Sequence, residues 1–316
     1  MSVARARDCV AVAGFVWLEG LDAEKAPEAQ AEAADDGMRE ARRETMGKRE
    51  YALGSTDAEH GRLMRQAAGL APLTERLFRE AGIGPGQRVL DLGSGVGDVA
   101  MLAARLVGPS GEVVGIERDT RSITLARARV AEAGLQNVKF LQVDAAEVES
   151  GEKFDALVGR LILQFLPEPG VLVRALAKLV RPGEIVAFHE PYWPATFSAC
   201  AQVPLWKAAA SIIYEAFSKA GVSTDMGLKL PGIFQQAGLP APVMRLEMPM
   251  GNDAEFVRWV PDLLSSLLPM ARQHGISTEK VGDLNTLVER TRAEVAAANA
   301  VVPWIALIGG WSRTAG

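Results

Sequence analysis

The 316-residue chain has little cysteine, little histidine and no excess of basic charge. Its two cysteines, Cys9 and Cys200, are too few for a disulfide framework or a cysteine-based zinc site, and we expect no metal. The formal net charge is −5 and no long basic run occurs, so we expect no nucleic-acid partner. No apolar run reaches the ~18 residues of a spanning helix, and we expect no membrane span.

Hydrophobic residues make up 48% of the chain and charged residues 23%, which is typical of a globular protein. Arg5 and Arg7 precede the apolar residues 9–18, a superficial resemblance to a short signal peptide, but a poor cleavage region follows. We therefore expect a cytoplasmic protein. Residues 1–50 are predicted to form a flexible or partly helical tail, and residues 51–316 to form the functional domain.

Residues 88–100 carry most of the functional information. An apolar run meets Asp91 and then glycines at alternate positions, Gly93, Gly95 and Gly97. Glycine permits positive φ and lets a ligand approach the backbone, so this pattern predicts a buried strand, a tight turn and a helix. Glu117 ends the next apolar run, 20 residues after Gly97, a separation that suits a carboxylate reaching a ribose hydroxyl.

The glycine spacing bears on which cofactor this turn binds. A dinucleotide fingerprint, G-x-G-x-x-G, counted from Gly93 would need a third glycine where Asp98 stands. Counted from Gly95, the third position is Ala100, which the relaxed pattern tolerates. An anionic side chain at the helix start would repel a pyrophosphate. A dinucleotide-dependent oxidoreductase is therefore a remote alternative.

The pattern Asp91-x-Gly93-x-Gly95-x-Gly97 resembles motif I of class I S-adenosylmethionine-dependent methyltransferases. The whole of residues 51–316 is similar to the UbiE-like small-molecule methyltransferases of bacteria. This resemblance implies S-adenosylmethionine as cofactor, with its methionine part over the glycine turn, its ribose on Glu117 and its adenine near Asp144. The cofactor-binding residues that it implies are Asp91, Gly93, Ser94, Gly95, Gly97, Glu117, Arg118, Asp144, Ala145 and Arg160.

Several of these residues have a purely structural alternative. Asp91 could hydrogen-bond the backbone of the turn, and Glu117 or Asp144 could cap the helix that follows. Arg160, at the end of the fourth predicted strand, could contact the cofactor, contact the acceptor or form a surface ion pair. The segment Leu179-Val-Arg-Pro-Gly-Glu184 departs from the family's L-x-P-G-G turn, because Glu184 replaces the second glycine.

The fold class that we predict is α/β. Strands near 88–92, 112–117, 138–143, 154–159 and 183–190 alternate with helices near 97–107, 119–133 and 168–180. This alternation indicates a Rossmann-like, doubly wound, mostly parallel seven-stranded sheet. A sixth strand is expected before residue 250 and an antiparallel last strand over 301–313.

The remaining segments are predicted to be helical. Thr56 and Glu59 form a capping box that opens a helix running to Gly82, in which Pro72 marks a kink or a break. Segments near 191–230 and 253–299, the first of them rich in aromatic residues, are expected to form a helical cap.

His189 and Glu190, at the end of the fifth strand, are the predicted catalytic residues. Side chains alternate along a strand, so we expect only one of them to face the site. Oxygen methylation benefits from a base, and histidine titrates near neutrality. The structural alternative is that His189 packs under a helix.

The function that we predict is methyl transfer to a small, partly apolar acceptor, with O-methylation favoured. The scarcity of cysteine counts against arsenite methylation, because enzymes of that kind use several thiols. Two alternatives remain open: a cofactor-binding protein that catalyses a non-methylating cyclisation, and a methyltransferase that acts on protein or RNA.

Overall fold

The computed structural model of the protein describes residues 56–199 and 202–316. The chain divides into residues 1–50 and 51–316, and the predicted N-terminal tail lies outside the described residues. Within the described ranges, no helix combines the length and apolar character that crossing a membrane requires.

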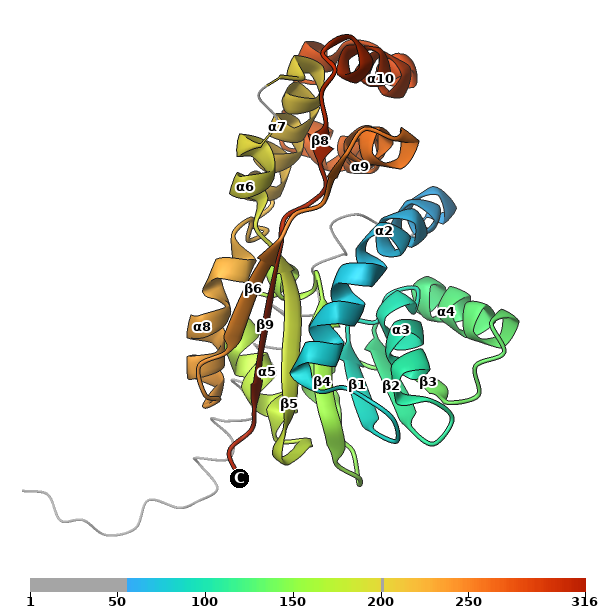
Figure 1. Ribbon diagram of the computed structural model, residues 1–316, viewed down its shortest axis with the longest axis vertical. Helices are drawn as coiled ribbons and strands as arrows, with labels where there is room; N and C mark the ends of the chain where they lie inside the picture. Colours follow the sequence, from blue (N-terminus) through green and yellow to red (C-terminus); the bar gives the residue numbers. More distant parts are fainter. Residues whose placement is uncertain (1–55, 200–201) are drawn as a thin grey trace, which may run out of the picture. The chain divides into compact units, whose positions relative to one another are not determined.

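A seven-stranded sheet with the order β3-β2-β1-β4-β5-β9-β6 forms the centre of the fold (Figure 1). Strands β1 to β5 are parallel, whereas β9 runs antiparallel to both of its neighbours. The predicted mostly parallel sheet with an antiparallel last strand is confirmed. The strands are β1 Arg88–Leu92, β2 Glu112–Glu117, β3 Val138–Gln142, β4 Phe154–Arg160, β5 Val180–Pro191, β6 Val243–Glu247 and β9 Leu307–Arg313.

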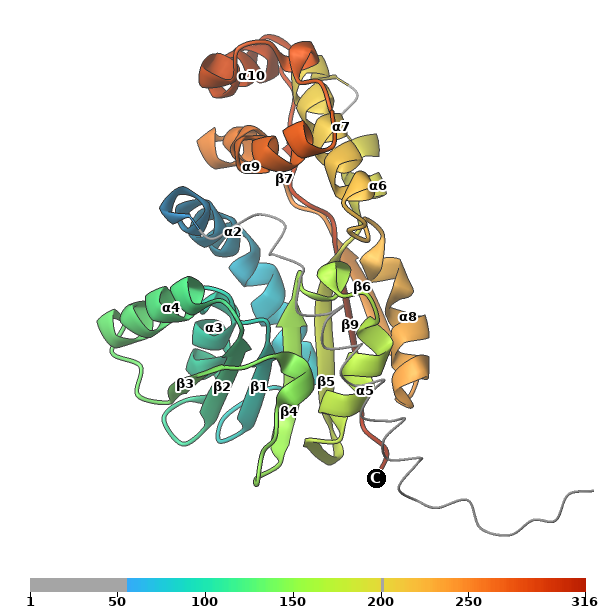
Figure 2. The ribbon, with the colours of Figure 1, turned by 180° about the vertical axis from the view of Figure 1, so that it is seen from behind.

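Helices cover both faces of this sheet, as the two views show (Figures 1 and 2). Side chains alternate along each strand, so Val89 and Val158 pack on one face while Leu90 and Leu157 pack on the other. The helices of the first face are α2 Asp57–Ala81, α3 Asp98–Val107 and α4 Thr120–Glu132. Those of the second face are α5 Pro169–Ala177 and α8 Met226–Ala237.

Helix α2 begins as the sequence predicts. The side chain of Thr56 accepts a hydrogen bond from the backbone N–H of Glu59 at 3.2 Å. Of the kink or break predicted at Pro72, the break is wrong, because one helix continues through it. A proline removes one backbone hydrogen bond, and burial of Leu70 and Leu77 on either side of Pro72 holds the helix in place.

A third apolar core, rich in tryptophan, joins the helices that lie beyond the carboxyl ends of the strands (Figures 1 and 2). We call this group the cap. It contains Trp193, Trp206, Trp259 and Trp304, and Trp259 stacks on Trp304 with ring centroids 5.6 Å apart. Its elements are α6 Trp193–Ser198, α7 Pro204–Lys219, α9 Ala254–Gln273, α10 Leu287–Ala297 and the two-stranded sheet of β7 Met250–Gly251 with β8 Val302–Pro303.

Two strand boundaries differ from the sequence prediction. Residues 301–313 do not form one strand: β8 pairs with β7 in the cap, and β9 begins only at Leu307. Pro303 has no N–H for a sheet, and the N–H of Trp304 donates to the carbonyl oxygen of Pro249 at 2.7 Å instead. Strand β5 also starts earlier than expected, at Val180 rather than at residue 183.

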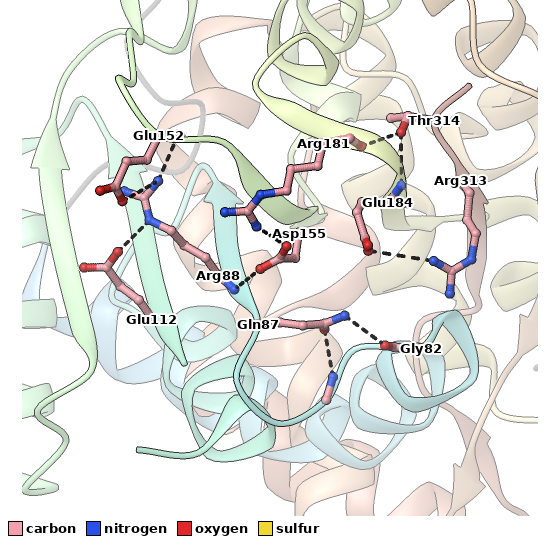
Figure 3. A network of polar contacts seen from close by, with 11 residues as sticks. Gly82, Gln87, Arg88, Glu112, Glu152, Asp155, Arg181, Glu184, Arg313 and Thr314 are labelled. Atoms are coloured by element: carbon pink, nitrogen blue, oxygen red, sulfur yellow. Dashed lines mark hydrogen bonds and ion pairs between the residues drawn. The ribbon is translucent and has the colours of Figure 1, made fainter. Parts of the chain in front are cut away.

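Ion pairs and hydrogen bonds tie together the amino ends of the strands (Figure 3). The backbone N–H of Arg88 donates to Asp155 at 2.7 Å, and its guanidinium donates to Glu112 at 2.6 Å. Arg181 also bonds Asp155. Ion pairs at or near the surface are usually worth at most about 1 kcal/mol each, so the main effect of these contacts is to align the strand starts. The opposite, carboxyl edge of the sheet carries the candidate site.

Gly309 and Gly310 allow α2 and α8 to pack closely on β9. A Cβ added at Gly309 would lie 2.6 Å from a methyl carbon of Leu77, and one at Gly310 would lie 3.0 Å from the Leu230 side chain. Leu77 is buried and has little room to move. Close contact of helix and strand therefore requires glycine here.

We expect Gly309→Ala to destabilise the protein by roughly 1–3 kcal/mol, the usual cost of overpacking a core. Gly232→Ala is the matched control, because Gly232 lies exposed in α8 with no atom within 4 Å of its added Cβ. The control should be neutral or stabilising by up to about 1 kcal/mol. Denaturant unfolding of both variants measures the difference, and equal stabilities would contradict this packing argument.

Candidate cofactor and acceptor site

The glycine turn connects β1 to α3 at the carboxyl edge of the sheet. Gly93, Gly95 and Gly97 have φ values of 66°, 51° and 88°, in the left-handed region that favours glycine. A Cβ on Gly93 would lie 2.5 Å from the Ile162 side chain, and one on Gly97 would lie 3.0 Å from Phe140. A Cβ on Gly95 would meet no atom within 4 Å. Close packing therefore accounts for glycine at positions 93 and 97, whereas the space beside the backbone of Gly95 is open.

Glu117, the last residue of β2, holds this turn in place. One carboxylate oxygen accepts the N–H of Gly95 at 3.0 Å, and the other accepts the N–H groups of Arg118 and Asp119 at 2.8 and 2.9 Å. The structural alternative for Glu117 fails, because Asp119 caps α4 by accepting the N–H of Ser122. A carboxylate has about four acceptor positions, so Glu117 retains capacity for one hydroxyl.

Asp144 and Ala145 follow β3 beside this turn. The N–H of Val143 donates to the carbonyl oxygen of Glu117 at 3.1 Å, which brings the two strand ends together. The Asp144 carboxylate accepts the N–H of Ala146 at 2.9 Å and caps a short 3-10 helix. The helix cap predicted as an alternative is therefore present, and Asp144 and Ala145 are both half-buried.

Ser94 and Arg118 occupy contrasting positions in the same region. The N–H of Ser94 donates to the carbonyl oxygen of Ile116 at 3.0 Å, and its hydroxyl is buried without a partner. The Arg118 side chain is exposed. Nearby, Nε2 of His60 lies 3.3 Å from the hydroxyl of Ser122, which joins the start of α2 to the start of α4.

Asp91 is a buried carboxyl group without a hydrogen-bond partner. Its side chain is 1% exposed, and neither oxygen makes a well-formed hydrogen bond, although the backbone N–H of Ala100 lies near enough to lower the pKa of this group. Burial raises the pKa of Asp91 to about 8, although Arg160 acts in the opposite direction. A buried group of this kind is costly unless a ligand supplies the missing donor. A bound ammonium group would supply both the hydrogen bonds and the opposite charge.

Arg160 and His189 share the face of the sheet on which Asp91 lies. The strand register pairs Asp91 with Val158 and Arg160 with His189. Nη1 of Arg160 donates to the hydroxyl oxygen of Thr74 at 3.0 Å, and that oxygen lies 3.2 Å from Nδ1 of His189. Burial, with a further effect of Arg160, lowers the pKa of His189 to about 3. His189 is therefore neutral at physiological pH.

Thr74 belongs to this cluster, although it is not among the site residues predicted from the sequence. It follows Leu70 by four residues and precedes Leu77 by three, so it lies on the buried face of α2. A polar residue within an apolar helical stripe is the signal that could have identified it. Its hydroxyl can also donate to the carbonyl oxygen of Leu70 at 3.2 Å.

Glu190 points to the opposite face, as alternation along β5 predicts. Its carboxylate accepts the N–H groups of Ile162 and Leu163 at 3.0 Å each, and that of Gln164 at 3.4 Å. Burial raises the pKa of Glu190 to about 7, although these hydrogen bonds act in the opposite direction. The carboxylate anchors the loop after β4, in which Leu161 has a φ of 57°. The structure thus separates the two predicted catalytic residues, and neither geometry favours a general base.

These features fit S-adenosylmethionine. The unpartnered Asp91 carboxyl suits an ammonium group, and the open side of Gly95 suits close contact with a ligand. Glu117, at the neighbouring strand end, has acceptor capacity for a ribose hydroxyl. Among the residues that the structure describes, no group of three or more His, Cys, Asp or Glu side chains could hold a metal ion.

Comparison with known proteins gives the same class. Residues 83–238 match the family model described as a methyltransferase domain. The ubiquinone biosynthesis O-methyltransferase of Paracidovorax citrulli is 35% identical over 122 residues, 38% of this chain and 45% of that protein. The arsenite methyltransferase of Halobacterium salinarum is 32% identical over 118 residues, 37% of this chain and 30% of that protein. A crystal structure of a putative methyltransferase from Bacillus halodurans, 16% identical, aligns with a TM-score of 0.52 over 76% of this chain and 98% of that one.

Residues 83–238 match a methyltransferase domain, and the fold and the matched relatives support the class I S-adenosylmethionine-dependent methyltransferases as the family and S-adenosylmethionine as the cofactor. The predicted family, fold class and cofactor are confirmed. The chain spans about half, or less, of the length of the curated relatives that it matches. The individual cofactor contacts, the domain boundaries and the catalytic residues stay predictions.

The contrast between two glycines of the turn tests the cofactor position. Gly95→Ala should leave folding almost intact, because its Cβ meets no atom, with a cost of about 1 kcal/mol for positive φ. Binding of S-adenosylmethionine should fall at least ~10-fold, because the methyl group occupies space that the ligand needs.

Gly93→Ala is the comparison variant, and it should lose thermal stability instead, because its Cβ collides with Ile162. Calorimetric titration and thermal melting of both variants give the two readouts. Unchanged cofactor affinity in a folded Gly95→Ala protein would exclude the proposed cofactor position.

Proposed function

We propose that this protein transfers a methyl group from S-adenosylmethionine to a small, partly apolar acceptor. The observation that carries the proposal is the buried Asp91 carboxyl, which has no hydrogen-bond partner beside the glycine turn. When bound, the cofactor supplies an electrophilic methyl group on a cationic sulfur. Asp91 would hold its ammonium group, Glu117 its ribose, and Asp144 with Ala145 its adenine.

The chain contributes orientation and exclusion of water. The cap packs its aromatic core beside the residues that follow β4, because Leu161 and Phe165 contact that core. An apolar acceptor held between the cap and the glycine turn would be desolvated and aligned with the methyl group, and alignment can account for a large part of a rate enhancement. This arrangement supports an acceptor with an apolar part.

Oxygen is the acceptor atom that we favour. The matched relatives include an O-methyltransferase and C-methyltransferases of quinone biosynthesis, and this similarity supports a small aromatic acceptor. A phenol, a quinol or a carboxylic acid would fit. The cytoplasmic location expected from the sequence stays a prediction.

A labelling screen tests this proposal. The protein is incubated with a metabolite extract and S-adenosylmethionine that carries an isotopic label in its methyl group. A labelled small molecule formed together with S-adenosylhomocysteine would support it. Label found only in protein or RNA would indicate a macromolecular acceptor. An extract component converted without use of label would indicate a non-methylating reaction.

The pKa of Asp91 gives a test that needs no acceptor. The pKa of Asp91 in the folded protein, about 8, lies above its ordinary value of 3.8. The neutral acid is therefore the favoured form in the folded protein, and the stability that it contributes is lost as the pH rises toward about 8. The charged groups that act on Asp91 are Arg160 on β4, Glu117 on β2 and Asp98 on α3.

Asp91→Asn should therefore stabilise the ligand-free protein by roughly 2–4 kcal/mol at about pH 8, and by less at about pH 6. The same variant should bind S-adenosylmethionine about 10–100-fold more weakly, because the amide leaves the ammonium group without a counter-charge. Denaturant unfolding and calorimetry measure both effects. A variant that is less stable at pH 8, or that binds the cofactor normally, would refute this role of Asp91.

A further inference from the structure

Arg160 carries a positive charge that the surrounding protein does not neutralise. Among the described residues, its guanidinium makes one hydrogen bond, to Thr74 at 3.0 Å, and no ion pair within 4.0 Å. A guanidinium has five N–H donors, so most of its capacity is unused. The side chain is half-buried, and burial lowers its pKa. A poorly solvated cation with spare donors is a recognition group for an anion.

The carboxyl groups nearby do not supply that anion. Asp91 is mostly protonated at neutral pH, because burial raises its pKa to about 8. Asp98 already forms an ion pair with Arg129 at 2.7 Å. His189, the other titratable neighbour, is neutral. Burial therefore leaves the cluster of Asp91, Arg160, Thr74 and His189 with an excess of positive charge.

Arg160 also lies between the strand that leads into the glycine turn and the cap. It ends β4, between the end of β1, which leads into the glycine turn, and the end of β5. The next residue, Leu161, packs against the apolar core of the cap. Arg160 thus ends a strand that lies beside β1, and the residue that follows it packs on the cap.

We propose that Arg160 recognises the acceptor as an anion, through an ionised oxygen of a phenolate, an enolate or a carboxylate whose apolar part faces the cap. This inference rests on the proposed methyl transfer. A fixed cation lowers the pKa of a hydroxyl that binds beside it, so a nucleophilic oxygen needs no general base. That agrees with the weak basicity of His189 and with the position of Glu190 on the opposite face. Arg160 is then a specificity residue of the acceptor site.

Two matched pairs of small aromatic probes test this inference. 4-Nitrophenol is compared with nitrobenzene, and benzoate with benzamide, each titrated calorimetrically at about pH 8 with S-adenosylhomocysteine present. The wild type should bind the anion of at least one pair about 10-fold or more tightly than its neutral match. Tighter binding of 4-nitrophenol than of nitrobenzene would indicate a phenolate site, and tighter binding of benzoate than of benzamide would indicate a carboxylate site.

Variants identify the residue responsible. Arg160→Gln should abolish the preference for the anion and leave the affinity of the neutral probes within about 2-fold, whereas Arg160→Lys should retain part of the preference. Arg245→Gln is the matched control, because it removes the same charge from β6, where Arg245 pairs with Glu80 on the surface. Circular dichroism and thermal melting confirm that each variant is folded.

Several outcomes would overturn the inference. A wild type without preference for either anion contradicts it directly, as does an Arg160→Gln protein that keeps the preference. If Arg160→Gln weakens S-adenosylhomocysteine but not 5′-methylthioadenosine, which lacks the amino-acid part, then Arg160 binds the cofactor carboxylate. A wild type that binds S-adenosylhomocysteine and fails only with the anions leaves the proposed function intact. A wild type that does not bind S-adenosylhomocysteine overturns both proposals.

Discussion

Burial of ionisable side chains at the carboxyl edge of the sheet is the constraint on which the site depends. Asp91, His189 and Glu190 each have a pKa shifted toward the neutral form, and desolvation is the main cause in all three. The three side chains differ in the hydrogen-bond partners that the protein gives them. Glu190 receives three backbone N–H groups, His189 lies beside the hydroxyl of Thr74, and Asp91 has no well-formed hydrogen bond. The one group left unsatisfied is also the one that lies closest in sequence to the glycine turn.

This difference gives Glu190 on β5 a structural role and leaves Asp91 on β1 available for a ligand. Glu190 stabilises the conformation of the loop after β4, and the Ile162 side chain of that loop packs against Gly93. The anchor on one face of the sheet therefore supports the turn at its edge. Asp91 contributes no such contact, and its burial is unfavourable for the ligand-free fold. Local conflict of this kind is expected at functional sites, where stability is given up for binding.

The sequence predicted the parts of the fold that depend on local pattern. Alternating strands and helices gave the sheet, and the glycine spacing with Glu117 gave the cofactor class. The extents of helices and strands near prolines were less predictable. Pro72 lies within a continuous helix, because tertiary burial outweighs its local preference, and Pro303 belongs to a second small sheet whose partner, Met250, is distant in sequence.

Side-chain partners were harder to predict than backbone elements. Nothing local indicates that Thr74 meets Arg160, 86 residues later, or that Glu190 binds the backbone of residues 162–164. Alternation did predict that His189 and Glu190 face opposite sides. Which side faces the cofactor turn depends on the packing of α2 against the sheet, and that contact is set by Leu77 against Gly309, far apart in the chain.

Helix α2 connects the elements that the proposed reaction needs. Its successive turns reach different parts of the fold: His60 meets Ser122 at the start of α4, Arg65 pairs with Asp262 of α9 in the cap, and Thr74 bonds Arg160. A Cβ on Gly69 would lie 2.9 Å from the ring of Trp304, so the middle of the helix packs directly on the cap core. Because one helix contacts all these regions, any shift of α2 would change the cofactor side and the acceptor side together. Helix α2, which packs on one face of the sheet, therefore also fixes the distance between the cap and the guanidinium of Arg160.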